Sequence, residues 1–174
     1  KRRILALIAS ATRRIYLVAL YLQDDEAGRE ILSALYAAKQ RNPALDIKVF
    51  VDFHRAQRGL IGKGKQGGNH LMYQAMAARH EHQIEIYGVP VKGRELLGVL
   101  HLKGFIFDDI LLYSGASLND IYLHQQERYR FDRYHQIHSQ ALTRSMVNYV
   151  DDAFLKSEAV QRLDRTGIPG AKQL

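Results

Sequence analysis

The polar residues that could do chemistry lie within one largely apolar stretch, residues 100–119. His101 and Lys103 are two positions apart, so on a strand both side chains would point to the same face. A neutral imidazole can attack phosphorus and hold it covalently, while an ammonium group and the amide of Asn119 can orient and neutralise phosphoryl oxygens. The stretch therefore suits phosphoryl transfer.

The alternative is a histidine that is hydrogen-bonded within the core, which is the usual role of a single histidine on an apolar strand. Lys103 on the same face argues against this alternative, because a buried lysine is costly unless an anion pairs with it. From these residues alone, an anion-handling site and a core histidine both remain open.

Two strands joined by a tight turn would carry these residues. Residues 100–107 and 110–113 are apolar runs, and Asp108-Asp109 is a typical turn sequence between them. The small residues 114–117 then loosen the backbone and bring Ser117 and Asn119 within reach of the first strand.

The chain before this hairpin has the pattern of a βαβ unit. Residues 15–22 form a continuous apolar run, as expected for a strand covered on both faces, and residues 47–53 form a second strand. Between them, Asp24 and Asp25 give a helix N-cap signal. A helical apolar stripe follows, at Ile31, Leu32, Leu35 and Tyr36. Strand, helix and strand in this order predict a parallel pair.

Basic residues follow the second strand and give a further candidate binding site. Asp52 ends the strand, and Arg55 and Arg58 come directly after it. Ligands of parallel sheets bind at the carboxyl ends of the strands, where arginines can hold a pyrophosphate bidentately. A solvated basic loop is an equally good interpretation. Residues 96–100 run apolar into His101 and could line a slot for acyl chains, although plain core packing is preferred.

Composition narrows the classes of partner. The net charge is +7 and the pI is about 9.7, which favours an anionic partner such as a nucleic acid, an acidic membrane surface or a phosphorylated substrate. The absence of cysteine excludes disulfides and thiolate metal sites, and the eight histidines show no ligand spacing, so neither a metal nor another cofactor is expected. No apolar run approaches the ~18 residues that span a bilayer.

The 174 residues suit one domain, which we expect over residues 1–156. Residues 157–174 are polar and weakly patterned, as in a tail or a linker toward a second domain. Further patterns predict helices over residues 71–79 and 142–156 and strands over residues 84–89 and 134–138.

The spacing His101-x-Lys103-x4-Asp108, followed by Ser117-x-Asn119, resembles the HKD motif of the phospholipase D superfamily. One departure is Ala116, which separates Gly115 from Ser117 where the family commonly has Gly-Ser-x-Asn. Longer stretches are similar to the phosphatidylserine synthase family within this superfamily, among them IYLVALYLQDDEAGREILSALYAAKQ, VDFHRAQRGLIG, GVLHLKGFIFDDILLYSGASLND and YLHQQERYRFDRYH.

The resemblance implies an α/β fold, an αβα sandwich with a mixed, largely parallel sheet. It also implies transfer of a phosphatidyl group from CDP-diacylglycerol to L-serine with release of CMP, through a phosphatidyl-histidine on His101. Lys103 and Asn119 would bind the phosphoryl oxygens, and Asp108 would support the turn. An acidic residue that orients the histidine would be Asp132, with Glu127 as its rival. A surface ion pair is the simpler role for either.

These enzymes carry two HKD motifs, whereas this chain has one, so a second motif is expected in the same chain or in a symmetric partner subunit. Ser117, Arg55 and Arg58 would contribute to substrate binding. We expect a cytoplasmic protein that associates peripherally with the anionic inner face of the cell membrane. The alternatives are a single-motif homodimeric phosphodiesterase or nuclease of the same superfamily, and a non-catalytic module that binds lipid or nucleic acid.

Overall fold

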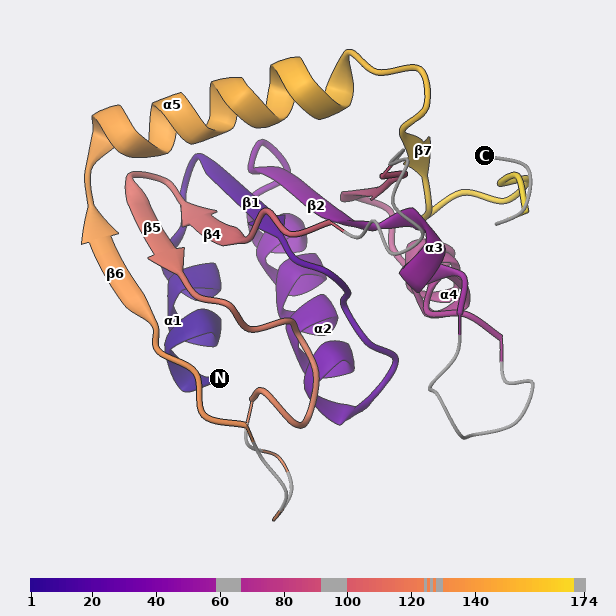
Figure 1. Ribbon diagram of the computed structural model, residues 1–174, viewed down its shortest axis with the longest axis horizontal. Coiled ribbons are helices and arrows are strands. Elements are labelled where there is room, and N and C mark those ends of the chain that lie inside the picture. The colour runs from indigo at the N-terminus through magenta and orange to yellow at the C-terminus, as the bar shows by residue number, and fades with distance from the viewer. Residues whose placement is uncertain (59–66, 92–99, 124, 126, 128–129, 171–174) are drawn as a thin grey trace.

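A seven-stranded sheet with helices on both faces forms the centre of the computed structural model (Figure 1). The structure describes residues 1–58, 67–91, 100–123, 125, 127 and 130–170. Its elements, in chain order, are α1 (Arg2–Ser10), β1 (Arg14–Val18), α2 (Glu26–Arg41), β2 (Asp46–Asp52), α3 (Phe53–Ala56), α4 (His70–Ala77), β3 (Glu85–Val89), β4 (Gly104–Phe107), β5 (Ile110–Tyr113), β6 (His135–His138), α5 (Gln140–Val150), the π-helical turn η1 (Asp151–Leu155) and β7 (Gln161–Arg162).

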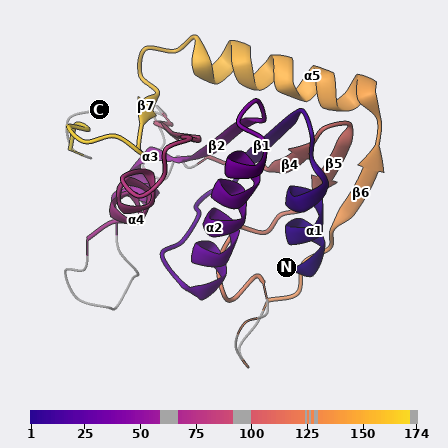
Figure 2. The same cartoon turned by 180° about the vertical axis from the view of Figure 1, so that it is seen from behind.

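Strand β1 shows why its sequence is apolar throughout. Ile15 and Leu17 pack into a cluster with residues of α1 and α2, whereas Tyr16 and Val18 pack into a second cluster with residues of α5 and η1. Alternate side chains therefore serve opposite faces of the sheet. Figure 2, seen from behind, brings α1 and α2 in front of the strands. This arrangement confirms the expected αβα sandwich.

The sheet is mixed, with strand order β6-β5-β4-β1-β2-β3-β7. The pairs β1–β2 and β2–β3 are parallel, as the βαβ pattern predicted. The other four pairs are antiparallel, so the sheet is less parallel than expected. The two-residue turn Asp108-Asp109 accounts for one of these pairs, β4–β5, because two-residue turns join only antiparallel strands.

The predicted N-terminal cap of α2 is present. The side chain of Asp25 accepts a hydrogen bond from the backbone N–H of Gly28, and Asp25 lies directly before the first helical residue. The predicted stripe is completely buried against the sheet, at Ile31, Leu32, Leu35 and Tyr36.

The β4–β5 hairpin is shorter at its start than the apolar run suggested. Strand β4 begins at Gly104, so His101 and Lys103 precede the strand and do not lie on it. The ladder with β1 ends at the pair Val18–Gly104, beyond which β1 has no further residues to pair with. The placement of both residues on one strand was therefore wrong.

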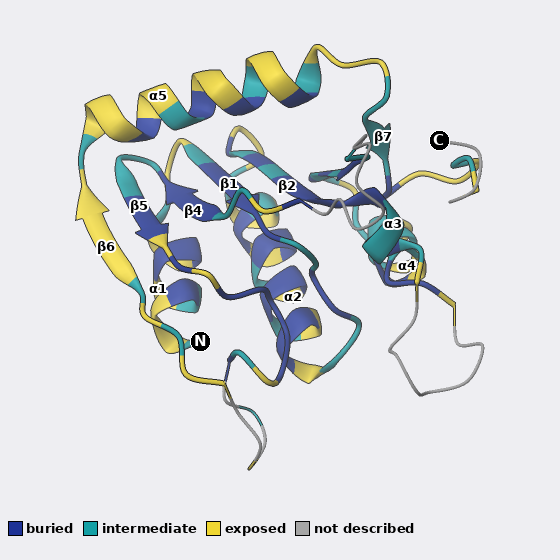
Figure 3. Ribbon diagram, in the orientation of Figure 1, coloured by how far each residue is buried: buried dark blue, intermediate teal, exposed yellow. Residues whose placement is uncertain are grey.

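The C-terminal segment adds a strand to the other edge of the sheet. Gln161 and Arg162, in β7, pair with Gly88 and Tyr87 of β3, and Leu163 and Asp164 are buried. Residues 161–164 were expected to belong to a polar tail, but the first two form a strand of the sheet and the other two are buried. Figure 3 shows that the opposite edge strand, β6, is exposed along its length.

Candidate functional site

Residues 100–103 lie beside the carboxyl ends of β1 and β2, which we call the carboxyl edge of the sheet. Strand β4 runs antiparallel to β1 with Gly104 opposite Val18, so the residues before β4 lie beyond the carboxyl end of β1. Strand β2 is parallel to β1, which places Asp52 at the same edge. This is the edge at which α/β sheets bind ligands.

The carboxylate of Asp52 fixes the backbone next to His101. Its Oδ2 atom accepts a hydrogen bond from the backbone N–H of Leu100 at 3.0 Å, and its Oδ1 atom accepts one from the N–H of Arg55 at 2.9 Å. Asp52 is only 1% exposed. One buried carboxylate thus ties the start of the motif to the first turn of α3.

His101 is exposed and Lys103 is half-buried. Neither side chain forms a hydrogen bond or ion pair within the described part of the chain. A core histidine would be buried and hydrogen-bonded, so the structure excludes that alternative for His101. An imidazole and an ammonium group without partners among the described residues are both available to an anion.

The second part of the motif packs against the segment that follows β1. The N–H of Leu118 donates to the carbonyl of Tyr21 at 3.2 Å, and the carbonyl of Leu118 accepts from the N–H of Gln23 at 2.9 Å. On either side of Leu118, Ser117 and Asn119 are buried. The amide nitrogen of Asn119 donates to the hydroxyl of Tyr21 at 3.3 Å, and its Oδ1 atom accepts from the N–H of Tyr122 at 3.0 Å.

The same segment also reaches the first part of the motif. The carbonyl of Leu20 accepts a hydrogen bond from the N–H of Asp52 at 3.1 Å, and the side chain of Asp52 holds Leu100. Leu20 and Tyr21 therefore stand between the Leu100 side and the Leu118 side of the motif. Hydrogen bonds through this segment connect the two parts that the sequence separates.

Tyr21, Tyr122 and Arg130 form a group that sequence analysis missed. A guanidinium nitrogen of Arg130 donates to the Tyr122 hydroxyl at 3.3 Å, and the guanidinium carbon lies 5.8 Å from the ring centre. Burial, and then the neighbouring Tyr122, raise the pKa of Tyr21, while the positive charges of Arg130 and Arg55 oppose the increase. The tyrosine- and arginine-rich composition of residues 122–133 was a signal for this group.

The two candidate arginines after β2 occupy different settings. Arg55 lies in α3, partly buried, and its charge acts on Tyr21 at the centre of the site. Arg58 is exposed just beyond α3. Within the described part of the chain, neither guanidinium group forms an ion pair.

Asp132 lies beside the motif residue Gly115. A Cβ atom built on Gly115 would stand 3.2 Å from the Oδ2 atom of Asp132, so glycine leaves room for the carboxylate. The other oxygen of Asp132 accepts from the N–H of Arg133 at 2.7 Å. No hydrogen bond joins Asp132 to His101 in the described structure, and the rival Glu127 is exposed. The orienting role of Asp132 stays a prediction.

Asp108 has a structural position at the far end of β4. Its carboxylate accepts hydrogen bonds from the N–H groups of Thr12, Arg13 and Arg14 at 2.8 to 2.9 Å, and from the hydroxyl of Thr12 at 3.1 Å. Burial alone would raise its pKa, but the hydrogen bonds from these three N–H groups outweigh burial and lower it. Asp108 therefore holds the hairpin turn to the start of β1.

The described residues contain no group of three or more potential metal ligands. No helix in the described part of the chain is long and apolar enough to cross a membrane. The apolar run at residues 96–99 lies outside the described residues, so its proposed slot has no structural test here.

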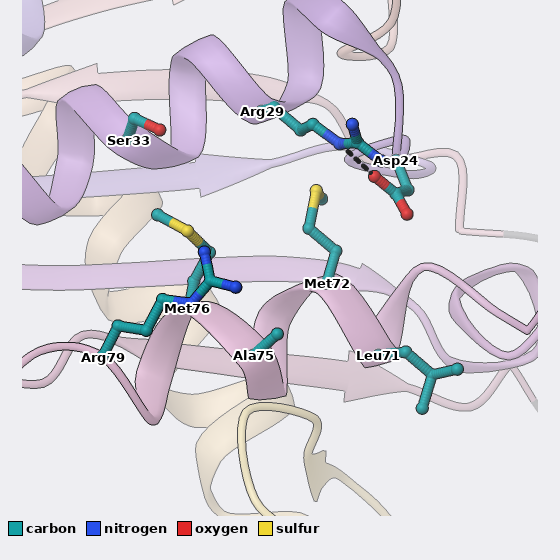
Figure 4. A pocket seen from close by; sticks show the side chains of 8 residues that line it. All are labelled: Asp24, Arg29, Ser33, Leu71, Met72, Ala75, Met76 and Arg79. Carbon is teal, nitrogen blue, oxygen red and sulfur yellow. Dashed lines mark hydrogen bonds and ion pairs between the residues drawn. The ribbon is translucent and has the colours of Figure 1, made fainter.

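A groove of about 480 Å³ lies between α2 and α4 (Figure 4). Methionine side chains form part of its lining, together with the ion pair between Asp24 and Arg29. The full lining is Asp24, Arg29, Ser33, Leu71, Met72, Ala75, Met76 and Arg79. None of the candidate motif residues belongs to it.

This chain is similar to a family of known domains and to proteins of known name. A family model described as "Cardiolipin synthase, PLD-like domain" matches residues 4–148. A CDP-diacylglycerol–serine O-phosphatidyltransferase of Haemophilus influenzae is 49% identical over 179 residues, which cover 100% of this chain and 39% of the relative. The corresponding protein of Escherichia coli, PssA, is 47% identical over 175 residues, again covering 100% of this chain and 39% of the relative.

Solved structures agree with these matches. The crystal structure of phosphatidylserine synthase from H. influenzae superposes with a TM-score of 0.91 at 48% identity, covering 99% of this chain and 38% of that one. NucT from Helicobacter pylori has a TM-score of 0.59 at 13% identity, covering 87% of this chain and 84% of NucT, and it supports the fold alone. The chain spans about two fifths of the length of the relatives named as transferases.

Proposed function

Because this chain belongs to the phospholipase D-like family, we propose that it is one motif-bearing half of an enzyme that makes phosphatidylserine from CDP-diacylglycerol and L-serine. The observation that carries the proposal is the match of the whole chain, at 47–49% identity, to two proteins named for this reaction. The intact set of His101, Lys103 and Asn119 supports a catalytic role rather than a binding module.

In the proposed reaction, His101 attacks the phosphorus that is attached to the lipid. The bond to CMP breaks, CMP leaves, and a phosphatidyl-histidine forms. The serine hydroxyl then attacks the same phosphorus, gives up its proton, and releases phosphatidylserine with His101 regenerated. The exposure of His101, and its lack of a partner among the described residues, support its role as the nucleophile.

Two steps need a second acid–base group, because the leaving group takes up a proton and the attacking serine loses one. We assign these transfers to the histidine of a second HKD motif, in the same chain or in a partner subunit. The relatives are about two and a half times as long as this chain, which leaves room for such a half. The reaction as proposed uses no cofactor.

Cations and amides around His101 would stabilise the charge on phosphorus. Lys103 and Asn119 would hold the phosphoryl oxygens, with Ser117 beside them. Arg55 in α3 and Arg58 just beyond it would bind the pyrophosphate of CDP-diacylglycerol. Asp132 would orient the imidazole.

We further propose peripheral attachment to the anionic inner face of the cell membrane, with the protein otherwise in the cytoplasm. The charge of +7 on this chain supports attraction to acidic lipids, and the substrate itself is a membrane lipid. The nuclease or phosphodiesterase alternative is not favoured, because the relatives that match the whole chain are named as phosphatidyltransferases.

Trapping tests the proposal. The complete enzyme is incubated with CDP-diacylglycerol labelled at the lipid phosphate, without serine, and quenched in alkali. The label should appear on the peptide that contains His101, and addition of serine should move it to phosphatidylserine. Cleavage of DNA without phosphatidyl transfer would overturn the proposal. Label on a histidine of the other half would keep the reaction but make His101 the acid–base partner.

A further inference from the structure

Asp52 is a buried charged residue that the proposed reaction does not use. It ends β2 and is 1% exposed, in a setting where an unpaired carboxylate would be costly. Each carboxylate oxygen accepts one backbone N–H, from Arg55 at 2.9 Å and from Leu100 at 3.0 Å. The first bond caps the short helix α3. The second has no such local explanation.

The hydrogen bond between Asp52 and Leu100 joins residues 48 positions apart, and Leu100 directly precedes His101. Residues 100–103 precede β4 and are outside the strand ladder, so neighbouring strands do not fix their backbone. The Leu100 side chain is buried in the same cluster as Val18 and Phe50. Leu100 is thus held at its N–H group and at its side chain, and His101 follows from this anchor.

We propose that Asp52 is a positioning residue, which fixes the backbone at Leu100 so that the His101 imidazole meets the phosphorus in line. This proposal rests on the phosphatidyl transfer described above. A displaced nucleophile loses the near-attack geometry, and a misplacement of about 1 Å costs about 10²-fold in rate. Asp52 also caps the start of α3. Its one carboxylate therefore holds both the backbone of Arg55 and the backbone that leads into His101.

A purely structural role would predict lost stability with normal chemistry in the molecules that remain folded. Asp164 offers a control, because it is also buried and its Oδ1 atom also accepts from a strand N–H, that of Ile86, at 3.1 Å, although it pairs with Arg162 as well. Asp52 pairs with Val89 at the end of β3, whereas Ile86 lies near its beginning. Asp164 is therefore remote from the carboxyl edge.

The experiment compares Asp52→Asn and Asp164→Asn in the complete enzyme, at a temperature where each is folded. An asparagine at position 52 keeps one acceptor oxygen and presents an N–H₂ group to the second donor. We expect Asp52→Asn to lower kcat by about 10²-fold with KM changed less than about threefold, and to slow labelling of His101 in a single turnover by the same factor. Asp164→Asn should leave kcat within about threefold of the unsubstituted enzyme.

Equal kcat values for the two variants, or an effect of Asp52→Asn on KM alone, would overturn the positioning role.

Hydrogen exchange of the unsubstituted protein gives a test that does not depend on a variant folding. The Leu100 amide should exchange as slowly as the amides of β4, and the His101 amide faster; a rapidly exchanging Leu100 amide contradicts the proposal. If the unsubstituted enzyme forms no labelled histidine, the transfer reaction itself fails. If the unsubstituted enzyme forms the labelled histidine and the Asp52→Asn enzyme forms it equally fast, only the positioning role fails.

Discussion

The side-chain amide of Asn119 donates a hydrogen bond to the hydroxyl oxygen of Tyr21 over 3.3 Å. Tyr21 accepts in this bond, and its own proton has no acceptor among the residues that the structure describes. Burial raises the pKa of Tyr21 first, with Tyr122 adding to the increase, so the hydroxyl keeps its proton at neutral pH. The hydroxyl is therefore able to donate to a phosphoryl oxygen beside Asn119.

We accordingly expect Tyr21→Phe to lower kcat by about 10- to 10²-fold, near the lower range for loss of one oxyanion donor. The ring remains to fill its half-buried position, so the melting temperature should change little. Tyr149→Phe is the control, because Tyr149 is an exposed tyrosine on α5. Steady-state assays with CDP-diacylglycerol and serine measure the effect, and equal activity of the two variants would remove Tyr21 from the site.

His101→Ala should abolish phosphatidyl transfer and histidine labelling without unfolding the protein, because the imidazole is exposed and packs in no core. Removing a covalent nucleophile should lower kcat by more than the factor of about 10² to 10³ that removal of one oxyanion donor costs. Lys103→Ala should also be severe, since the phosphoryl charge would lose the cation that the motif supplies. His135→Ala, an exposed histidine on β6, is the control. Near-normal turnover of His101→Ala would refute the assignment.

Asp132→Asn should have a milder effect, a loss of about tenfold, if the carboxylate orients a general acid–base or nucleophilic ring. Glu127→Gln is the comparison, because Glu127 is exposed while Asp132 lies against the motif at Gly115. Turnover and histidine labelling are measured for both variants. The reverse order of effects would transfer the orienting role to Glu127.

Asp108→Ala should lower the free energy of unfolding by about 2 kcal/mol, because three backbone N–H groups lose their acceptor and alanine is unfavourable at the positive φ of this residue. Asp108→Asn should cost less, since its amide oxygen still accepts and asparagine tolerates this conformation. Asp109→Ala is the neighbouring control, because it loses only an exposed ion pair with Arg13. Urea unfolding at neutral pH gives the three values.

The lowered pKa of Asp108 adds a pH dependence to this comparison. A carboxyl group whose pKa is lower in the folded state stabilises the protein above its unfolded pKa of about 3.9. That stabilisation is lost as the pH falls from about 4 toward the folded value. The difference between the unsubstituted protein and Asp108→Asn should therefore shrink as the pH falls below about 4. A difference that stays constant to lower pH would show that the charge of Asp108 contributes nothing.

Flotation with lipid vesicles tests the proposed membrane attachment. The complete protein should bind anionic vesicles better than neutral ones at low salt, because each basic residue near such a surface contributes roughly 1 kcal/mol. Binding should weaken as salt is added. Equal binding to both kinds of vesicle at low salt would contradict the electrostatic mechanism.

Local patterns were enough to predict the cap of α2, the parallel β1–β2 pair and the existence of β1, although β1 ends at Val18 and not at residue 22. Each depends on the nature of neighbouring residues, such as the apolar run at residues 15–22 or the acceptor at Asp25. The motif residues were likewise visible from their spacing alone. Their resemblance to the phospholipase D superfamily is confirmed by the family match.

Features set by distant pairing were not predictable in the same way. The start of β4 depends on where β1 stops offering partners, and the apolar residues before Gly104 do not encode that limit. Tyr21 enters the site only because Leu118 pairs with its backbone. Asp52 was recognised as a strand end, but its bond to Leu100 crosses a span that no local pattern describes.

Strand β7 is synthesised long after β3, the strand that it pairs with. The outer edge of β3 is complete only when Gln161 and Arg162 pair with it and the N–H of Leu163 reaches the carbonyl of Ile86 at 2.7 Å. During synthesis on the ribosome, β3 emerges well before these residues. Until they follow, the backbone N–H and C=O groups on its outer edge lack a strand partner. Unpaired strand edges of this kind attract other chains. Nascent chains that stop short of β7 should therefore depend most on chaperones.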